Sequence, residues 1–299
     1  MIDLERLSIT SELDPPFLVA RPPEQTAAFV LCSGHSGRVY PSALTKASRL
    51  ETLALRKSED CYVDDLFEPA VGLGAPMIAA RFPRAYLDVN REPYELDPEL
   101  FSDALPAYAN TQSMRVAGGL GTIPRIVSEN EPIYPGRLPL AVAHERIERL
   151  YKPFHGALQE LIADTQRVFG FAVLIDCHSM PSASMQQPSG PRPDFVIGDR
   201  FGASCAPRLT RLVRDQLTNE GFRVQLNRPY AGGYITEHYG RPKHAVHALQ
   251  IEINRALYLD ESTLSVHLGF RPLREALARL MMRLFAEFPT AGVQRAAAE

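Results

Sequence analysis

Short apolar segments alternate along the chain with longer stretches in which apolar residues recur at helical spacing. Each short segment is followed by polar or glycine-rich residues, which is typical of strands buried on both faces of a sheet. By this pattern we predict strands at residues 28–32, 85–89, 172–176 and 249–253.

Residues 141–169 have the clearest helical pattern, because apolar side chains three or four residues apart share one face of a helix. The repeating residues are Leu150, Phe154, Leu158 and Leu161. Pro153 is expected to kink or divide this helix, and Gly170 stands where helices commonly end. The same pattern predicts further helices at residues 208–220 and 264–288.

The alternation of strands and helices predicts an α/β fold. The sequence contains no internal repeat, low-complexity segment or Gly/Ser linker. We therefore expect a single domain over residues 1–299 with its core at about residues 25–290. Ligands of α/β sheets gather beyond the carboxyl ends of the strands, and several polar clusters of this sequence fall at such ends.

The composition narrows the possible partners. Of the 299 residues 45% are hydrophobic and 22% charged, and the formal net charge of -3 offers no footprint for nucleic acid or an anionic membrane. The apolar runs are far shorter than the roughly 20 residues of a membrane helix. The acidic, proline-broken N-terminus does not resemble a signal peptide. We therefore expect a cytoplasmic protein whose four cysteines are free thiols.

Two histidines stand at the ends of predicted strands. His35 lies between Gly34 and Gly37 after the first strand, and His178 follows the third strand. Asp176 precedes His178 by two residues, so both side chains would point the same way if the strand continues. This layout is expected for a metal site or an acid/base pair. The alternatives are a hydrogen-bonded but inert His35, and an Asp176 that caps a turn beside a structural His178.

The stretch SEDCYVDDLF supplies three carboxylates: Asp60, Asp64 and Asp65. One carboxylate and two histidines form a common zinc triad of hydrolases, in which water takes the open position. If the stretch is helical, Asp60 shares the inner face marked by Val63 and Phe67, whereas Asp64 lies at its edge. The alternative is an acidic first turn that favours the helix dipole.

Glu252 lies inside the apolar strand pattern, between Ile251 and Ile253. A carboxylate in a buried strand is costly unless it is paired or its pKa is shifted. Glu252 is therefore a candidate general base, and the alternative is an ion pair with Arg255 or with a more distant arginine.

Two further clusters have the chemistry of substrate binding. Asn90 and Arg91 follow the run AYLDV, and an arginine fork with an asparagine suits a free carboxylate. An Asx-type turn with a surface salt bridge is the alternative for this pair. The stretch RPYAGGYITEHYG is predicted to be a loop over a site, from which His238 and Tyr239 could reach in, or else a hairpin turn.

Taken together, the chain resembles the N-formylglutamate amidohydrolase family. The stretches that carry the resemblance run in order from about residue 30 to residue 261: SGHSGRVYP, SEDCYVDDLF, GAPMIAARFPRAYLDVNREPYELDP, GLGTIPRI, IYPGRLP, LIDCHSMPS, DFVIGDRFGASCAP, RPYAGGYITEHYG and LQIEINRALYLDE. The family is similar to zinc carboxypeptidases. The resemblance therefore implies a mixed, mostly parallel sheet flanked by helices, a phosphorylase/hydrolase-like sandwich with one Zn²⁺ per chain. It also implies cleavage of N-formyl-L-glutamate to formate and L-glutamate, a reaction of histidine breakdown.

The resemblance also assigns residues to roles. His35 and His178 would be metal ligands, Glu252 the general base, and Asn90 with Arg91 the grip on the substrate α-carboxylate. Carboxypeptidases have a glutamate ligand three residues after the first histidine, where this chain has Arg38. The carboxylate ligand must therefore come from elsewhere, and Asp60 is preferred over Asp64. A dicarboxylate substrate would need further cations, for which the candidates are Arg125 and Arg137.

Three rival functions are compatible with parts of the pattern. The chain could be an amidase or carboxypeptidase-like hydrolase of another N-acyl amino acid or short peptide, or a non-catalytic carboxylate-binding module. A cysteine or serine hydrolase using Cys205 or Ser179 with His178 is disfavoured, because the sequence has no G-x-S-x-G elbow. In the preferred interpretation the partner is a small-molecule N-acyl amino acid, with no role for nucleic acid or a membrane.

Overall fold

The computed structural model describes residues 1–127, 131–185 and 192–288. By their internal packing these residues form two compact units. The first contains Met1–Leu18, Gly34–Cys61 and Ala79–Gln159, and the second contains Val19–Ser33, Tyr62–Ile78 and the chain from Glu160 onward. The expectation of a single domain concerns independent folding, and it stays a prediction.

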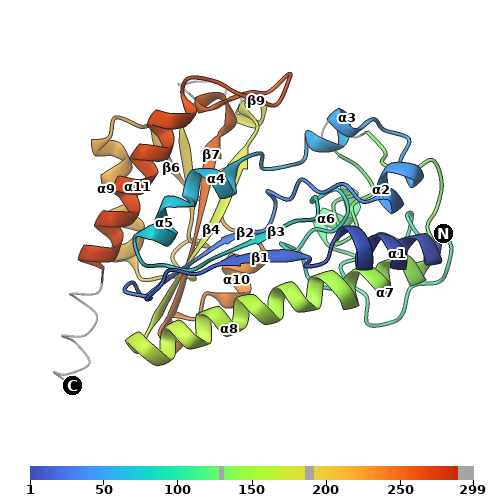
Figure 1. The fold of residues 1–299 in the computed structure, drawn as a ribbon, viewed down its shortest axis with the longest axis horizontal. Coiled ribbons are helices and arrows are strands. Elements are labelled where there is room, and N and C mark those ends of the chain that lie inside the picture. The colour runs from blue at the N-terminus through green and yellow to red at the C-terminus, as the bar shows by residue number, and fades with distance from the viewer. Residues whose placement is uncertain (128–130, 186–191, 289–299) are drawn as a thin grey trace. The chain divides into compact units, whose positions relative to one another are not determined.

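The elements alternate as the sequence pattern indicates (Figure 1). The α-helices are α1 (Ile2–Glu12), α2 (Ser42–Ala47), α3 (Thr52–Arg56), α4 (Val63–Phe67), α5 (Pro69–Gly72), α6 (Met114–Ala117), α7 (Leu140–Arg146), α8 (Lys152–Phe169), α9 (Pro207–Asn219), α10 (Tyr234–Tyr239) and α11 (Phe270–Glu287). The strands are β1 (Phe17–Ala20), β2 (Phe29–Ser33), β3 (Met77–Ala80), β4 (Ala172–Met180), β5 (Phe195–Gly198), β6 (Val224–Leu226), β7 (Val246–Asn254), β8 (Leu259–Asp260) and β9 (Ser265–Val266). No helix in the described ranges is long and apolar enough to cross a membrane.

Within the described residues, seven strands form one sheet in the order β1-β3-β2-β4-β7-β5-β6. The pairs β2–β4, β4–β7 and β5–β6 are parallel, and β5 runs antiparallel to β7. This arrangement confirms the α/β class and the mixed, mostly parallel sheet. It also confirms the strands predicted at residues 28–32, 172–176 and 249–253, which lie within or overlap β2, β4 and β7.

The strand predicted at residues 85–89 is wrong. The carbonyl oxygen of Pro83 accepts the amides of Tyr86 and Leu87, at N–O distances of 2.9 and 3.3 Å, which closes a turn instead of a strand. Four of these five residues are apolar and all five are buried, and burial alone does not distinguish a turn from a strand. Arg146 holds the turn from α7, since its Nη1 donates to the Tyr86 carbonyl oxygen at 2.9 Å.

The two faces of the central strands have different neighbours. On one face the ring of Phe29 contacts that of Phe285 in α11, with centroids 4.7 Å apart. Because side chains alternate along a strand, Cys32, Asp176 and Glu252 belong to the opposite face. Helix α10 packs against β4 and β7 within the same unit. Polar residues therefore gather on the face of these strands away from α11.

The helix predicted at residues 141–169 is divided, as expected near Pro153. Helix α7 leads into a π-helical turn at Ile147–Tyr151, and α8 follows directly (Figure 1). Gly170 ends α8 with φ +78°, a conformation that favours glycine. The helix predicted at residues 208–220 is confirmed as α9. The one predicted from residue 264 begins only at Phe270, because Ser265–Val266 pairs with β8.

Candidate metal centre and active site

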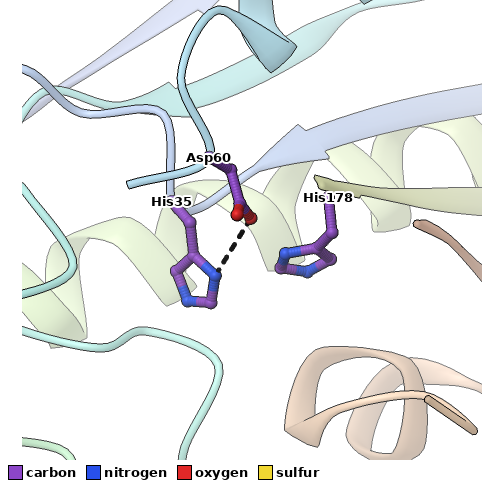
Figure 2. A group of neighbouring side chains, drawn as sticks. All are labelled: His35, Asp60 and His178. Atoms are coloured by element: carbon purple, nitrogen blue, oxygen red, sulfur yellow. Dashed lines mark ion pairs between the residues drawn. The ribbon is translucent and has the colours of Figure 1, made fainter. Parts of the chain in front are cut away.

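His35, Asp60 and His178 form a buried group of potential metal ligands (Figure 2). His35 follows β2 by two residues, Asp60 lies between α3 and α4, and His178 belongs to β4. Each offers one ligand atom, and these atoms all lie within 4.8 Å of one another. His35 Nδ1 is 3.5 Å from Asp60 Oδ2. The side chains that sequence patterns and family likeness indicated as ligands are thus brought together.

Asp60 joins this group for a different reason from the one predicted. The helical face argument does not hold, because α4 begins only at Val63, after Tyr62 with φ 61°. Asp60 precedes the helix, and its backbone N–H donates to the His35 carbonyl oxygen at 3.0 Å. This backbone bond sets the carboxylate beside the His35 ring. Asp64 and Asp65 lie within α4 and are half-buried.

The His35 ring is oriented by Asp88, a residue that the apolar pattern of its segment does not mark as functional. His35 Nε2 lies 2.7 Å from Asp88 Oδ1, and both side chains are almost fully buried. A carboxylate accepts, so Nε2 donates, and in the neutral tautomer that can ligate a metal the lone pair is on Nδ1. That lone pair faces the Asp60 carboxylate, an arrangement that a cation between the two would stabilise.

The His178 ring is held in the same way by Asp176. His178 Nε2 lies 2.9 Å from Asp176 Oδ1, and Asp176 is fully buried. The second oxygen of Asp176 accepts from the Thr236 hydroxyl of α10 at 3.1 Å. The alternative in which Asp176 caps a turn is wrong, because β4 continues through both residues to Met180.

The donor set suits a divalent metal ion. Ligating histidines almost always give their other N–H to a carboxylate or carbonyl, as both rings do here. Two imidazoles and one carboxylate leave an open fourth position, which is the pattern of catalytic zinc sites. Bonds of about 2.0–2.2 Å in tetrahedral geometry put two ligand atoms about 3.4 Å apart, and His35 Nδ1 and Asp60 Oδ2 are 3.5 Å apart.

Asp88 also links His35 to the Asn90–Arg91 pair. Oδ1 of Asp88 accepts the Asn90 backbone N–H at 2.8 Å, and Oδ2 lies 2.9 Å from Arg84 Nε and 3.4 Å from Arg91 Nη2. Burial opposes ionisation of Asp88, but Arg91, His35 and Arg84 outweigh it and hold the pKa well below its usual range. Asp88 is therefore the anionic centre of a cationic cluster. A signal existed in the spacing, since an aspartate side chain readily accepts the backbone N–H two residues on in an Asx turn, as Asp88 does from Asn90.

Arg91 is buried and its position is fixed by backbone oxygens. Its Nε donates to the Leu120 carbonyl and its Nη1 to the Asn90 carbonyl, both at 2.7 Å. Burial lowers the pKa of Arg91 to about 10, which leaves it charged at neutral pH. The Arg91 carbonyl in turn accepts from the Tyr151 hydroxyl at 2.6 Å. The alternative for this pair, an Asx-type turn with a surface salt bridge, holds only in part. An Asx-type turn is present, since Asp88 Oδ1 accepts the Asn90 N–H. The surface salt bridge is wrong, because Asn90 and Arg91 are 4% and 6% exposed.

The two further arginine candidates differ from Arg91. Arg125 pairs with Asp97 and Glu99, at 2.7 and 3.1 Å, and its side chain is 29% exposed, whereas that of Arg91 is buried. Arg137 is exposed on the segment before α7. Their contact with substrate stays a prediction.

Glu252 is buried in β7 and is the register partner of His178 in the neighbouring strand. Partner residues of paired strands share a face, so the candidate base lies on the side of the sheet that carries His178. Oε1 of Glu252 accepts from Gln250 Nε2 at 2.8 Å. Arg255, proposed as an alternative ion partner, directs its Nε to the Ser179 hydroxyl at 3.1 Å.

In the stretch RPYAGGYITEHYG, residues 228–233 form a loop and residues 234–239 form α10, so the hairpin alternative is wrong and His238 and Tyr239 lie on a helix and not on the loop. His238 is exposed and stacks on Tyr234, with centroids 4.9 Å apart, whereas Tyr239 is half-buried. Their contact with substrate stays a prediction.

The buried Cys205 does not suit nucleophilic catalysis. Burial raises the pKa of its thiol to about 11, so the thiolate is scarce at neutral pH. Its sulfur lies 3.4 Å from the Thr210 hydroxyl. These surroundings are those of a structural cysteine.

Comparisons with known proteins show the family of this chain. Residues 27–259 match the model of the family described as N-formylglutamate amidohydrolase. The N-formylglutamate deformylase of Pseudomonas aeruginosa is 34% identical over 205 residues, which are 68% of this chain and 71% of that protein. The one from Pseudomonas putida is 32% identical over 206 residues, with the same coverage of 68% and 71%.

Solved structures extend the similarity to the fold. The crystal structure of N-formylglutamate amidohydrolase from Ralstonia eutropha superposes with a TM-score of 0.87 at 35% identity. The match covers 93% of this chain and 99% of that one. A gene product of Agrobacterium tumefaciens, 18% identical, has the same fold with a TM-score of 0.63 over 93% and 96% of the two chains. The chain belongs to the N-formylglutamate amidohydrolase family.

Proposed function

We propose that this enzyme is a zinc-dependent deformylase that hydrolyses N-formyl-L-glutamate to formate and L-glutamate. The observation that carries the proposal is the buried His35–Asp60–His178 group, with each histidine backed by an aspartate. The similar proteins of the two Pseudomonas species, named N-formylglutamate deformylases, support the substrate. The substrate is then a small molecule with two carboxylates and one formamide.

His35, Asp60 and His178 would hold one Zn²⁺ per chain. When bound, Zn²⁺ lowers the pKa of a coordinated water from 15.7 towards about 7 and polarises a carbonyl group. Asp88 and Asp176 keep the two imidazoles in the tautomer and orientation needed for ligation.

Glu252 acts as the general acid and base. Its carboxylate accepts the proton of the attacking water as the new C–O bond forms at the formyl carbon. It then gives this proton to the glutamate nitrogen as the C–N bond breaks, so that formate and the amino acid leave. Water is consumed and no other reactant is required.

Arg91 and Asn90 hold the α-carboxylate of the substrate. The buried Arg91 guanidinium keeps its charge and is fixed by carbonyl oxygens, so little conformational entropy is lost when it binds an anion. A fixed carboxylate limits the orientations of the bound substrate, which favours the reactive geometry.

The test measures zinc content and formate release from N-formyl-L-glutamate, with and without a chelator. We expect about one zinc per chain and formate release that the chelator abolishes and added zinc restores. Glu252→Gln should keep the zinc and lower kcat roughly 100- to 10,000-fold. His35→Ala and His178→Ala should lose the zinc. Arg91→Lys should raise KM with the metal content unchanged.

A panel of N-acetyl amino acids and dipeptides serves as the substrate control. Zinc without formate release, but with turnover of a panel member, would replace the substrate and keep the hydrolase. A protein that binds no metal and turns over nothing after zinc is added would be a carboxylate-binding module, contrary to this proposal.

A further inference from the structure

The first turn of α10 is bonded to two adjacent strands in a matching way. In β4, Asp176 contacts His178 on one side and the Thr236 hydroxyl on the other. In β7, Gln250 contacts Glu252 on one side and the Gly233 amide on the other. Asp176 and Gln250 are register partners, as are His178 and Glu252. Gln250 therefore supports the proposed base Glu252 in the same way that Asp176 supports the proposed metal ligand His178.

The orientation of the Gln250 amide is determined by its neighbours. Its Oε1 accepts the Gly233 backbone N–H at 2.7 Å, and a backbone N–H is always a donor. The NH₂ group must therefore point to the other neighbour, and Nε2 lies 2.8 Å from Glu252 Oε1. Gln250 is 3% exposed, so both bonds are shielded from water. A donor on the carboxylate fixes its rotamer and stabilises its charged form.

The loop on the other side of Gln250 has little freedom. Gly232 adopts φ +115°, which disfavours any other residue. A Cβ atom on Gly198 of β5 would lie 2.5 Å from the Gly232 nitrogen, so the loop backbone is pressed against the strand. The loop leads directly into α10, which carries the predicted substrate contacts His238 and Tyr239.

We propose that Gln250 is a positioning residue that fixes Glu252 and ties it to the glycine loop before α10. The inference rests on the proposed function, since it takes Glu252 as the base. The Gln250 side chain then fixes both the orientation of the Glu252 carboxylate and the position of the Gly233 backbone. The glycine loop and the Glu252 carboxylate therefore keep a constant distance from each other.

Two substitutions separate the two bonds. Gln250→Glu keeps an oxygen for the Gly233 amide but replaces the amide donor by a second carboxyl group, which must share a proton with Glu252 or repel it and so perturbs the base. Gln250→Met loses both bonds at similar volume. We expect kcat for formate release to fall about 10- to 100-fold in both variants. KM should stay near the wild-type value in Gln250→Glu and rise in Gln250→Met. Zinc content should remain at the wild-type level in both.

The rate of hydrogen exchange at the Gly233 amide reports on its bond to Gln250 independently of activity. The amide should be protected in the wild type and in Gln250→Glu, and should exchange faster in Gln250→Met. Gln166→Met is the control, because Gln166 also donates its side-chain amide, here to the His244 carbonyl at 2.7 Å, but lies outside the site. This control should have wild-type kcat, KM and Gly233 protection.

The outcomes distinguish this inference from the proposed function. If the wild type releases formate and Glu252→Gln does not, wild-type kcat in both Gln250 variants overturns the inference alone. Unchanged Gly233 exchange in Gln250→Met also overturns it, since the loop would then be held by other contacts. A wild-type protein that turns over no N-acyl amino acid overturns the proposed function, and the role of Gln250 with it.

Discussion

Asp88 and Asp176 hold the two histidines by the same atom, but they differ in the charge around them. Asp88 lies beside the guanidinium groups of Arg84 and Arg91. In the part of the chain that the structure describes, Asp176 has the Thr236 hydroxyl as its second partner and no arginine or lysine ion pair. Both aspartates thus orient a histidine ring, but Asp88 does so in an ionic environment and Asp176 in a neutral one.

The difference follows from what each aspartate connects. Asp88 joins His35 to Arg91, so one carboxylate serves both the metal ligand and the predicted grip on the substrate. Asp176 joins His178 to α10 through Thr236, and this connection needs a hydrogen bond but no charge. We therefore expect isosteric substitutions of the two aspartates to have unequal effects.

Asp88→Asn should have the largest effect. Either orientation of the new amide points its NH₂ group at donors, the arginines on one side and His35 with the Asn90 amide on the other. Arg91 would also lose its buried counter-charge, which costs about 3–5 kcal/mol. Zinc affinity should fall about 10- to 100-fold and KM should rise. Chemical denaturation, zinc titration and kinetics measure the three effects, and an unchanged KM would separate Asp88 from the substrate grip.

Asp176→Asn should have the next largest effect, confined to the metal. The amide oxygen can still accept from His178, and its NH₂ can donate to the Thr236 hydroxyl, so both bonds survive. The loss of negative charge should lower zinc affinity about 10-fold. The free energy of unfolding of the metal-free protein should change by less than about 1 kcal/mol. A loss of stability as large as that of Asp88→Asn would show that the two environments are equivalent.

Thr236→Val tests the neutral connection from its other end. The substitution keeps the shape of the side chain and removes the donor to Asp176. The free energy of unfolding should fall by about 1–2 kcal/mol, because one buried carboxylate oxygen of Asp176 loses its hydrogen-bond donor. Zinc affinity should change by less than in Asp176→Asn. Wild-type stability in Thr236→Val would mean that α10 does not support Asp176.

Arg84→Met should have the smallest effect. The Arg84 side chain is 27% exposed, and Asp88 keeps Arg91 and His35 as partners. Exposed or half-exposed pairs contribute at most about 1 kcal/mol, so stability, KM and zinc affinity should stay close to the wild type. A KM increase as large as that of Asp88→Asn would instead assign the substrate contact to Arg84.

The sequence pattern predicted the central strands well and the connecting segments poorly. β2, β4 and β7 are apolar runs that end in polar residues, and the sheet buries them on both faces. Residues 85–89 have the same pattern but form a turn, because a buried turn needs apolar residues as a strand does. Local periodicity does not distinguish these two cases, since the difference lies in distant hydrogen-bond partners.

The candidate site was predictable where chemistry and position coincide. His35 and His178 stand at strand ends, and Glu252 is a charge within an apolar run, so each is conspicuous in the sequence. Asp88 was not, because it sits in a run that was interpreted as a strand. Gln250 carries no charge and precedes a more conspicuous carboxylate. Residues that act by orienting another side chain are recognised only when their contacts are known.

Because a π-helical turn lies between α7 and α8, the contacts that hold Arg91 depend on the number of residues in this helix. The turn contains Tyr151, whose hydroxyl bonds the Arg91 carbonyl, and His155 one turn later has Nε2 2.8 Å from the Val89 carbonyl. A π turn holds one residue more than an α turn. Deleting one residue there would restore a regular helix and rotate the two sides of the turn by about 100° relative to each other. The site therefore depends on a count of residues in a helix as well as on the identity of its side chains.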